Sequence, residues 1–154
     1  MIEVRIQPFD PWAELSAYQQ SLAIQKGGFG ATAVFVGTMR DFNEEVAVAA
    51  MTLEHYPGMT EKHLDEITRE AKSRWAILDT LVIHRVGQLQ PNEPIVLCAV
   101  WSAHRQAAFA ACRFLIEALK SRAPFWKKEL TEESGRWVER NTRDKGWDCA
   151  KNPP

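Results

Sequence analysis

The spacing of apolar residues along the chain changes between a period of two, typical of strands, and a period of three to four, typical of amphipathic helices. The period of two, or an unbroken apolar run, predicts strands at residues 2–7, 30–39, 46–56, 77–86 and 95–101. The run at 95–101 is almost wholly apolar, so we expect this strand in the middle of a sheet. The strand at 30–39 carries small residues and is expected to be buried.

The longer period predicts helices at residues 11–24, 61–75 and 103–121. Pro11 fits the first turn of a helix, where its missing N–H costs nothing. Each predicted helix follows a residue whose side chain can cap a helix N-terminus. These predicted caps are Asp10, Thr60 and Ser102.

Polar and turn-forming residues predict the connections between these elements. We expect a polar, mobile loop at residues 40–45 and a turn-rich link at 87–94. A short last element is expected to begin at Trp137, and residues 141–154 are expected to form a polar tail. No low-complexity linker divides the chain. The sequence therefore predicts one α+β domain over residues 1–154, with a mixed or antiparallel sheet and about three helices.

Composition and charge exclude several functional classes. The chain has 154 residues, 45% of them hydrophobic, and a net charge of −1, so we do not expect general binding to nucleic acids or to a membrane surface. No apolar run is long enough to span a membrane, and the charged, proline-containing first ten residues do not have the pattern of a signal peptide. The cysteines lack CxxC spacing, which argues against a disulfide framework or a zinc site and favours a cytoplasmic protein.

The sequence also lacks the common motifs of nucleotide-binding proteins and hydrolases. Neither GxGxxG, GxxxxGK[ST] nor GxSxG is present. No group of His, Asp and Glu residues has metal-ligand spacing. The remaining polar candidates are lysine, arginine and histidine. These favour electrostatic stabilisation and lysine acid–base chemistry, and we expect no metal or redox cofactor.

Two lysines on either side of a break in the chain are the first candidates for chemistry. Pro124 ends the third predicted helix soon after Lys120, because proline lacks an N–H and has a fixed φ. Lys127 follows an aromatic pair on the other side of the break. Two ammonium groups beside an apolar anchor suit an anionic substrate or a proton transfer. The same spacing is also typical of a solvated basic turn.

The start of the same helix is a candidate anion site. His104 and Arg105 follow a predicted strand at the helix N-terminus, where free N–H groups and the helix dipole favour anions. The alternative is a capping histidine beside a solvated arginine. Arg40 lies where the strand at 30–39 ends, a place that often carries function, although it could equally be an ordinary surface residue. We interpret a second pair, His84–Arg85, as structural.

Helix length limits how these candidates can combine. His104 and Lys120 are sixteen residues apart on one predicted helix, which separates them by about 24 Å. The two side chains cannot share one small-molecule pocket within a single chain. If both contact the same substrate, the pocket must combine two subunits, and a symmetric dimer would have two such pockets.

Several short segments give the chain a resemblance to a known family. They are Gly30–Ala31, Phe35–Arg40 (FVGTMR), Leu53–Met59 (LEHYPGM), Ile83–Gly87 (IHRVG), Ser102–Arg105 with Ala108–Phe109, Leu119–Lys120, Pro124–Glu129 (PFWKKE), Gly135 and Trp137. In this order, over about residues 2–140, they resemble the large, catalytic subunit of molybdopterin synthase, the MoaE family.

The resemblance implies a function and an assembly. The family converts cyclic pyranopterin monophosphate (precursor Z) into molybdopterin by installing two dithiolene sulfurs. Each sulfur arrives as a thiocarboxylate on the C-terminal Gly-Gly of a small ubiquitin-like, MoaD-like subunit. The implied assembly is a heterotetramer with a central homodimer of large subunits. The implied fold is of the α/β-hammerhead type with an additional subdomain.

The resemblance also implies the site. It makes Lys120 and Lys127 the acid–base residues, and it implies that the His–Arg pair comes from the opposite large subunit. The implied substrate-binding residues are Phe35, Thr38, Met39, Arg40, His104, Arg105, Lys128 and Glu129. Either Arg140 or Arg143 could assist the anion site. Two other functions stay open, namely a non-catalytic adaptor for a ubiquitin-like protein and a phosphate-ester hydrolase on a similar scaffold.

Overall fold

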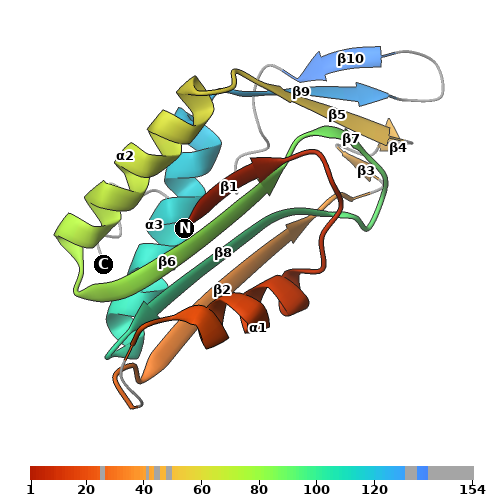
Figure 1. Ribbon diagram of the computed structural model, residues 1–154. Coiled ribbons are helices and arrows are strands. Elements are labelled where there is room, and N and C mark those ends of the chain that lie inside the picture. The colour runs from red at the N-terminus through yellow and green to blue at the C-terminus, as the bar shows by residue number, and fades with distance from the viewer. Residues whose placement is uncertain (25–26, 41, 44–45, 48–49, 131–134, 139–154) are drawn as a thin grey trace.

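Helices and strands follow one another in an α+β order, as predicted (Figure 1). The structure is a computed structural model that describes residues 1–24, 27–40, 42–43, 46–47, 50–130 and 135–138. In this part of the chain the helices are α1 (Pro11–Ser21), α2 (Met59–Arg74) and α3 (Arg105–Arg122). The strands are β1 (Ile2–Arg5), β2 (Ala31–Thr38), β3 (Phe42–Asn43), β4 (Val46–Ala47), β5 (Ala50–His55), β6 (Ile77–Arg85), β7 (Gly87–Leu89), β8 (Pro94–Ser102), β9 (Phe125–Leu130) and β10 (Gly135–Val138).

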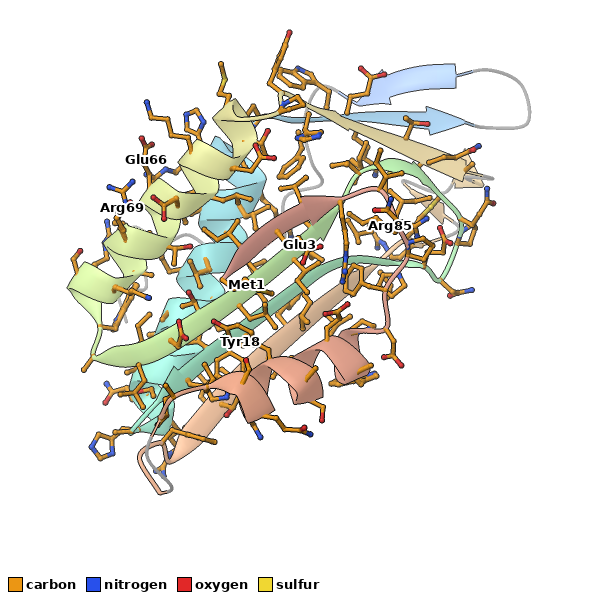
Figure 2. All side chains as sticks on the ribbon, viewed as in Figure 1. Met1, Glu3, Tyr18, Glu66, Arg69 and Arg85 are labelled. Atoms are coloured by element: carbon orange, nitrogen blue, oxygen red, sulfur yellow. The ribbon has the colours of Figure 1, made fainter. Side chains whose placement is uncertain are left out.

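The larger sheet is mixed and is covered on both faces. Its strand order is β1-β6-β8-β2, with β1 parallel to β6 and the other pairs antiparallel. The apolar strand β8 lies between two neighbours, which confirms the prediction of a central strand. Helices α2 and α3 cover one face and α1 covers the other (Figure 1). The polar side of α2, with Glu66 and Arg69, is turned away from the sheet (Figure 2).

A second sheet lies at one end of the first (Figure 1). Its strand order is β10-β9-β5-β7, and all of its pairs are antiparallel. Side chains from both sheets form a separate small core beneath it. Its members are Met39, Met51, Leu53 and Leu89, with Ile95 packed against them. This arrangement brings the end of β2 under the second sheet.

Three sequence predictions about strands are wrong. Strand β2 is not buried: it is the last strand in its sheet order, and Ala33 is its one buried residue. The polar loop expected at 40–45 contains β3, which pairs with β4 in a short antiparallel ladder. Of the strand expected at 46–56, the structure describes β4 and β5, and residues 48–49 between them lie outside the described residues. The link at 87–94 likewise contains β7, which pairs with β5.

Helix starts were predicted less well than helix centres. Asp10 caps α1 as predicted, since its carboxylate accepts hydrogen bonds from the N–H groups of Trp12 and Ala13. Thr60, by contrast, is buried inside α2, and Gly58 is the N-cap with φ of 81°. A positive φ suits glycine because it has no Cβ to clash. His104, rather than Ser102, is the N-cap residue of α3.

The C-terminal tail and membrane-spanning segments were also addressed by the sequence predictions. The expected polar tail at 141–154, together with Arg140 and Arg143, lies outside the described residues. Among the residues that the structure does describe, no helix is both long enough and apolar enough to cross a membrane.

Candidate functional site

The break between the two candidate lysines is present as predicted. Lys120 lies in the last turn of α3, where its side chain is exposed. The helix ends at Arg122, ahead of Pro124, and the chain then enters β9. Lys127 is the third residue of that strand and is half-buried. The described part of the site therefore has one lysine at a helix end and one on a strand.

Strand register determines which way Lys127 faces. Lys127 pairs with Leu53 of β5, and directly paired residues of antiparallel strands lie on the same face of a sheet. Leu53 belongs to the small core that also contains Met39. Arg40 directly follows Met39 and is exposed. The pairing therefore places Lys127 on the side of the second sheet where the Met39–Arg40 segment lies.

The side chain of the neighbouring residue Trp126 lies on the opposite face of the second sheet, because side chains alternate along a strand. Trp126 is 42% exposed, and its ring meets that of Tyr56 edge to face, with 4.7 Å between the ring centroids. The backbones of Lys128 and Glu129 continue β9, while their side chains lie outside the described part of the structure.

The start of β9 is anchored by a buried histidine. Phe125 stacks on His84 with ring centroids 3.9 Å apart and an interplanar angle of 13°. The Nδ1–H of His84 donates a hydrogen bond to the carbonyl oxygen of Arg85 at 2.9 Å. The pKa of His84 is lowered to about 4, chiefly by burial and to a smaller extent by nearby His55, while the bond to the Arg85 carbonyl opposes the shift. His84 is therefore neutral at neutral pH, and our structural interpretation of the His84–Arg85 pair agrees with its burial.

We expect the free energy of unfolding to fall as the pH is lowered from 6.5 to 4. The pKa of His84 is about 4 in the folded protein against an ordinary value of 6.5. In that window the unfolded chain binds a proton that the folded chain does not, so stability rises with pH. The shift corresponds to about 3 kcal/mol at most. Urea unfolding at several pH values measures this effect.

The matched variants for this measurement are His84→Asn and His63→Asn. Asparagine can still donate to the Arg85 carbonyl but does not titrate, so the pH dependence should become flatter between pH 4 and 6.5. His63 sits in the first turns of α2, where its ring contacts the backbone carbonyl of Met59, and its replacement should leave the slope unchanged. An unchanged slope in His84→Asn would show that other groups cause the acid sensitivity.

The candidate anion site lies at the opposite end of α3. His104 is the N-cap of this helix, Arg105 is its first residue, and both side chains are exposed. A close backbone approach holds the segment in place: the N–H of Gly30 donates to the Ser102 carbonyl at 3.0 Å. A Cβ at position 30 would lie 2.5 Å from the Ala103 carbonyl oxygen, so the site requires glycine there.

One chain therefore does not bring all the candidate residues together. Helix α3 runs unbroken from Arg105 to Arg122, so His104 and Lys120 lie at opposite ends of it. Lys127 and Arg40 belong to the Lys120 end, through the second sheet and its core. The side chain of Met39 is buried in that core, while Thr38 is exposed at the end of β2.

An open apolar groove of about 290 Å³ lies between β2 and α3. Its lining includes Phe35, to which the family resemblance assigned a place in the substrate site. Phe109, which also lines it, is 67% exposed, an unusual environment for a large aromatic residue. The other lining residues are Ala33, Val34, Cys112, Arg113, Ile116 and Glu117. Sequence reasoning missed this groove, although the apolar pattern of β2 on both faces was a signal for it.

Among the described residues, no three His, Cys, Asp or Glu side chains are grouped so that they could hold a metal ion. Cys98 and Cys112 are both buried. The cationic groups at the two ends of α3 are instead suited to binding anions.

Known proteins resemble this chain over most of its length. The family described as MoaE protein matches residues 7–122. The molybdopterin synthase catalytic subunit of Pseudomonas aeruginosa is 53% identical over 143 residues, which are 93% of this chain and 93% of that protein. The solved molybdopterin biosynthesis MoaE protein from Burkholderia ambifaria has a TM-score of 0.76 and 46% identity, covering 94% of this chain and 92% of that one. Molybdopterin synthase from Staphylococcus aureus has a TM-score of 0.78 and 33% identity, covering 90% of this chain and 96% of that chain.

Proposed function

The chain belongs to the MoaE protein family, and we propose that it is the catalytic subunit of a molybdopterin synthase. In this function it transfers sulfur from the thiocarboxylated C-terminus of a small ubiquitin-like subunit to cyclic pyranopterin monophosphate, forming the dithiolene of molybdopterin. The observation that carries this proposal is 53% identity to a molybdopterin synthase catalytic subunit over 93% of both chains.

The partners follow from the same function. The chain works with a MoaD-like sulfur carrier and with a second copy of itself, in a heterotetramer with a central homodimer. The substrate is a pterin that carries a cyclic phosphate. The odd number of cysteines and the absence of CxxC from the sequence support a reducing, cytoplasmic setting.

The chemistry requires cations and a proton carrier. The thiocarboxylate sulfur bonds to a carbon of the pterin as a carbon–oxygen bond at that carbon breaks, and the departing oxygen takes up a proton. Water then cleaves the acyl–sulfur link, which releases the carrier's carboxylate and leaves sulfur on the pterin. We assign Lys120 as the main acid–base residue and Lys127 as its partner. Arg40, His104 and Arg105 attract the phosphate and the anionic sulfur donor. Thr38, Lys128 and Glu129 complete the proposed substrate site, and Phe35 lines it. Met39, whose side chain is buried in the small core, supports the backbone before Arg40 rather than contacting substrate.

The two lysines of β9 are expected to differ in importance. Lys127→Ala should lower turnover about 10-fold more than Lys128→Ala, because Lys127 shares the face of Leu53 and strand side chains alternate. Product formation by the two variants, with the same carrier and precursor, measures the difference. Equal losses would mean that both lysines act only through their charge.

A second copy of the chain is the occupant that best fits the β2–α3 groove. The substrate-binding groups at the two ends of α3 must come from different subunits if they meet one small molecule. Residue 112 lies midway between residues 104 and 120, and Cys112 lines the groove. A two-fold axis there would set the two α3 helices antiparallel and put His104 of each copy beside Lys120 of the other.

Charge and exposure support the same arrangement. Three large apolar residues of the groove are exposed, namely Val34 and Phe35 of β2 and Phe109 of α3. Exposed apolar surface of this kind is typical of an interface. Arg113 and Glu117 also line the groove. In an interface of two identical surfaces, each of these charges can face its opposite on the other copy.

The direct experiment is incubation of the purified protein with precursor Z and the thiocarboxylated carrier, with the dithiolene product as readout. Product that depends on both reactants supports the proposal. An adaptor would bind the carrier without forming product. A phosphate-ester hydrolase would act on the precursor when no carrier is present.

A further inference from the structure

The backbone just before Arg40 is hydrogen-bonded to the turn that precedes β8. The N–H of Met39 donates to the Glu93 carbonyl at 2.9 Å, and the Met39 carbonyl accepts from the N–H of Asn92 at 2.9 Å. The side chain of Met39 is 4% exposed in the small core. Two hydrogen bonds and one buried side chain therefore fix the position of Met39, the residue directly before Arg40.

The carboxylate of Glu93 shapes this turn. Its Oε2 accepts a hydrogen bond from the N–H of Gln90 at 2.7 Å, and the Glu93 N–H donates to the Gln90 carbonyl at 3.1 Å. Asn92 has a φ of 68°, a left-handed conformation that asparagine tolerates better than most residues. The N–H of Gln90 and the guanidinium of Arg85 lower the pKa of Glu93, so it is a carboxylate at neutral pH.

The same carboxylate pairs with a buried arginine. Nη1 of Arg85 lies 2.9 Å from Oε2 of Glu93, and the arginine side chain is 7% exposed. Its Nε donates to the Ile6 carbonyl at 3.2 Å and its Nη2 to the Gln88 carbonyl at 3.3 Å. Arg85 thus joins the segment after β1, strand β7 and the turn. A buried guanidinium needs such a partner, because an unpaired charge in the interior is costly.

We propose that Arg85 and Glu93 are positioning residues for Arg40. Their ion pair fixes the turn at residues 90–93, the turn fixes the Met39 backbone, and the guanidinium of Arg40 is thereby held where it meets the phosphate of the substrate. This inference rests on the proposed function, in which Arg40 binds that phosphate. Neither Arg85 nor Glu93 is assigned a contact with substrate.

The test is a double-mutant cycle between Glu93→Gln and Arg40→Ala, read as the Kd for precursor Z by titration calorimetry. Glutamine keeps the size of the side chain and an oxygen that can accept from Gln90, but it removes the charge that pairs with Arg85. Glu93→Gln should weaken binding about 10-fold in the wild-type background and by less than about 2-fold in the Arg40→Ala background, a coupling typical of residues in one network. Turnover at saturating precursor should change little.

Glu14→Gln is the matched control. Glu14 also pairs with an arginine, Arg5, and its side chain is 32% exposed against 30% for Glu93, but it lies on α1. This variant should lose stability without a change in Kd. If Glu93→Gln does not fold, Glu93→Asp, which keeps the charge but shortens the reach, takes its place with the same expectation.

The outcomes separate the inference from the function on which it rests. If Arg40→Ala leaves the Kd unchanged, the role of Arg40 in the proposed function is wrong, and the inference fails with it. If Arg40→Ala weakens binding but Glu93→Gln weakens it equally in both backgrounds, the proposed function stands and only the positioning role is overturned.

Discussion

Replacing Lys120 with alanine is expected to lower the rate of dithiolene formation at least about 100-fold, the lower range for loss of a positioned acid–base group. The protein should stay folded, because Lys120 is exposed in the last turn of α3 and its removal opens no core cavity. Single-turnover product formation with saturating carrier measures the rate. Thermal unfolding checks the fold.

The matched control is Arg122→Ala. Arg122 lies in the same last turn, is also exposed, and pairs with Glu70 across to α2. The two variants remove one positive charge each from the same helix end, so they share any loss of favourable interaction with the helix dipole. Arg122→Ala should therefore reproduce the loss of charge but not the loss of turnover. Near-normal turnover in Lys120→Ala would exclude the lysine from acid–base chemistry.

The local features of the fold could be predicted from the sequence. Asp10 followed by Pro11 predicted the start of α1, and the unbroken apolar run at 95–101 predicted a central strand, because both signals depend on neighbouring residues alone. The failure at Thr60 has a local cause too. Thr60 resembles a cap in sequence, but the preceding Gly58 can adopt a positive φ and begins the helix earlier.

The exposure of β2 could not be predicted in the same way. The apolar pattern of a strand predicts that it is buried, but the pattern is the same whether the covering residues belong to the same chain or to another. Within the described chain, β2 is last in its sheet, and Val34 and Phe35 remain exposed. The error is therefore informative, since it identifies the surface to which we assign the second subunit.

Some features of the candidate site could be predicted from the sequence and others could not. The separation of His104 from Lys120 follows from helix length and was predictable. The direction of Lys127 depends on its pairing with Leu53, about seventy residues earlier, and no local pattern contains that register. The Arg85–Glu93 pair could not be predicted either, because the sequence indicated a structural role for Arg85 but no local pattern indicated its partner.

Two inactive variants are expected to restore activity when they form a mixed dimer. Lys120→Ala and His104→Ala each damage both pockets of their own homodimer. In the mixed dimer, one pocket receives both lesions and the other receives neither. Random exchange between equal amounts should therefore return about a quarter of wild-type activity, since half the dimers are mixed and each has one intact pocket.

Differently tagged chains allow the mixed dimer to be isolated, and its activity should then be about half that of the wild type. The control mixes Lys120→Ala with Lys127→Ala. Both lysines belong to the same end of α3 and the adjoining strand, so each pocket of that mixed dimer keeps one lesion and no activity should return. Adding Phe109→Asp to both chains of the first pair should also prevent recovery, because it places a charge in the apolar groove. Confirmed exchange with no return of activity would show that His104 and Lys120 do not serve one pocket.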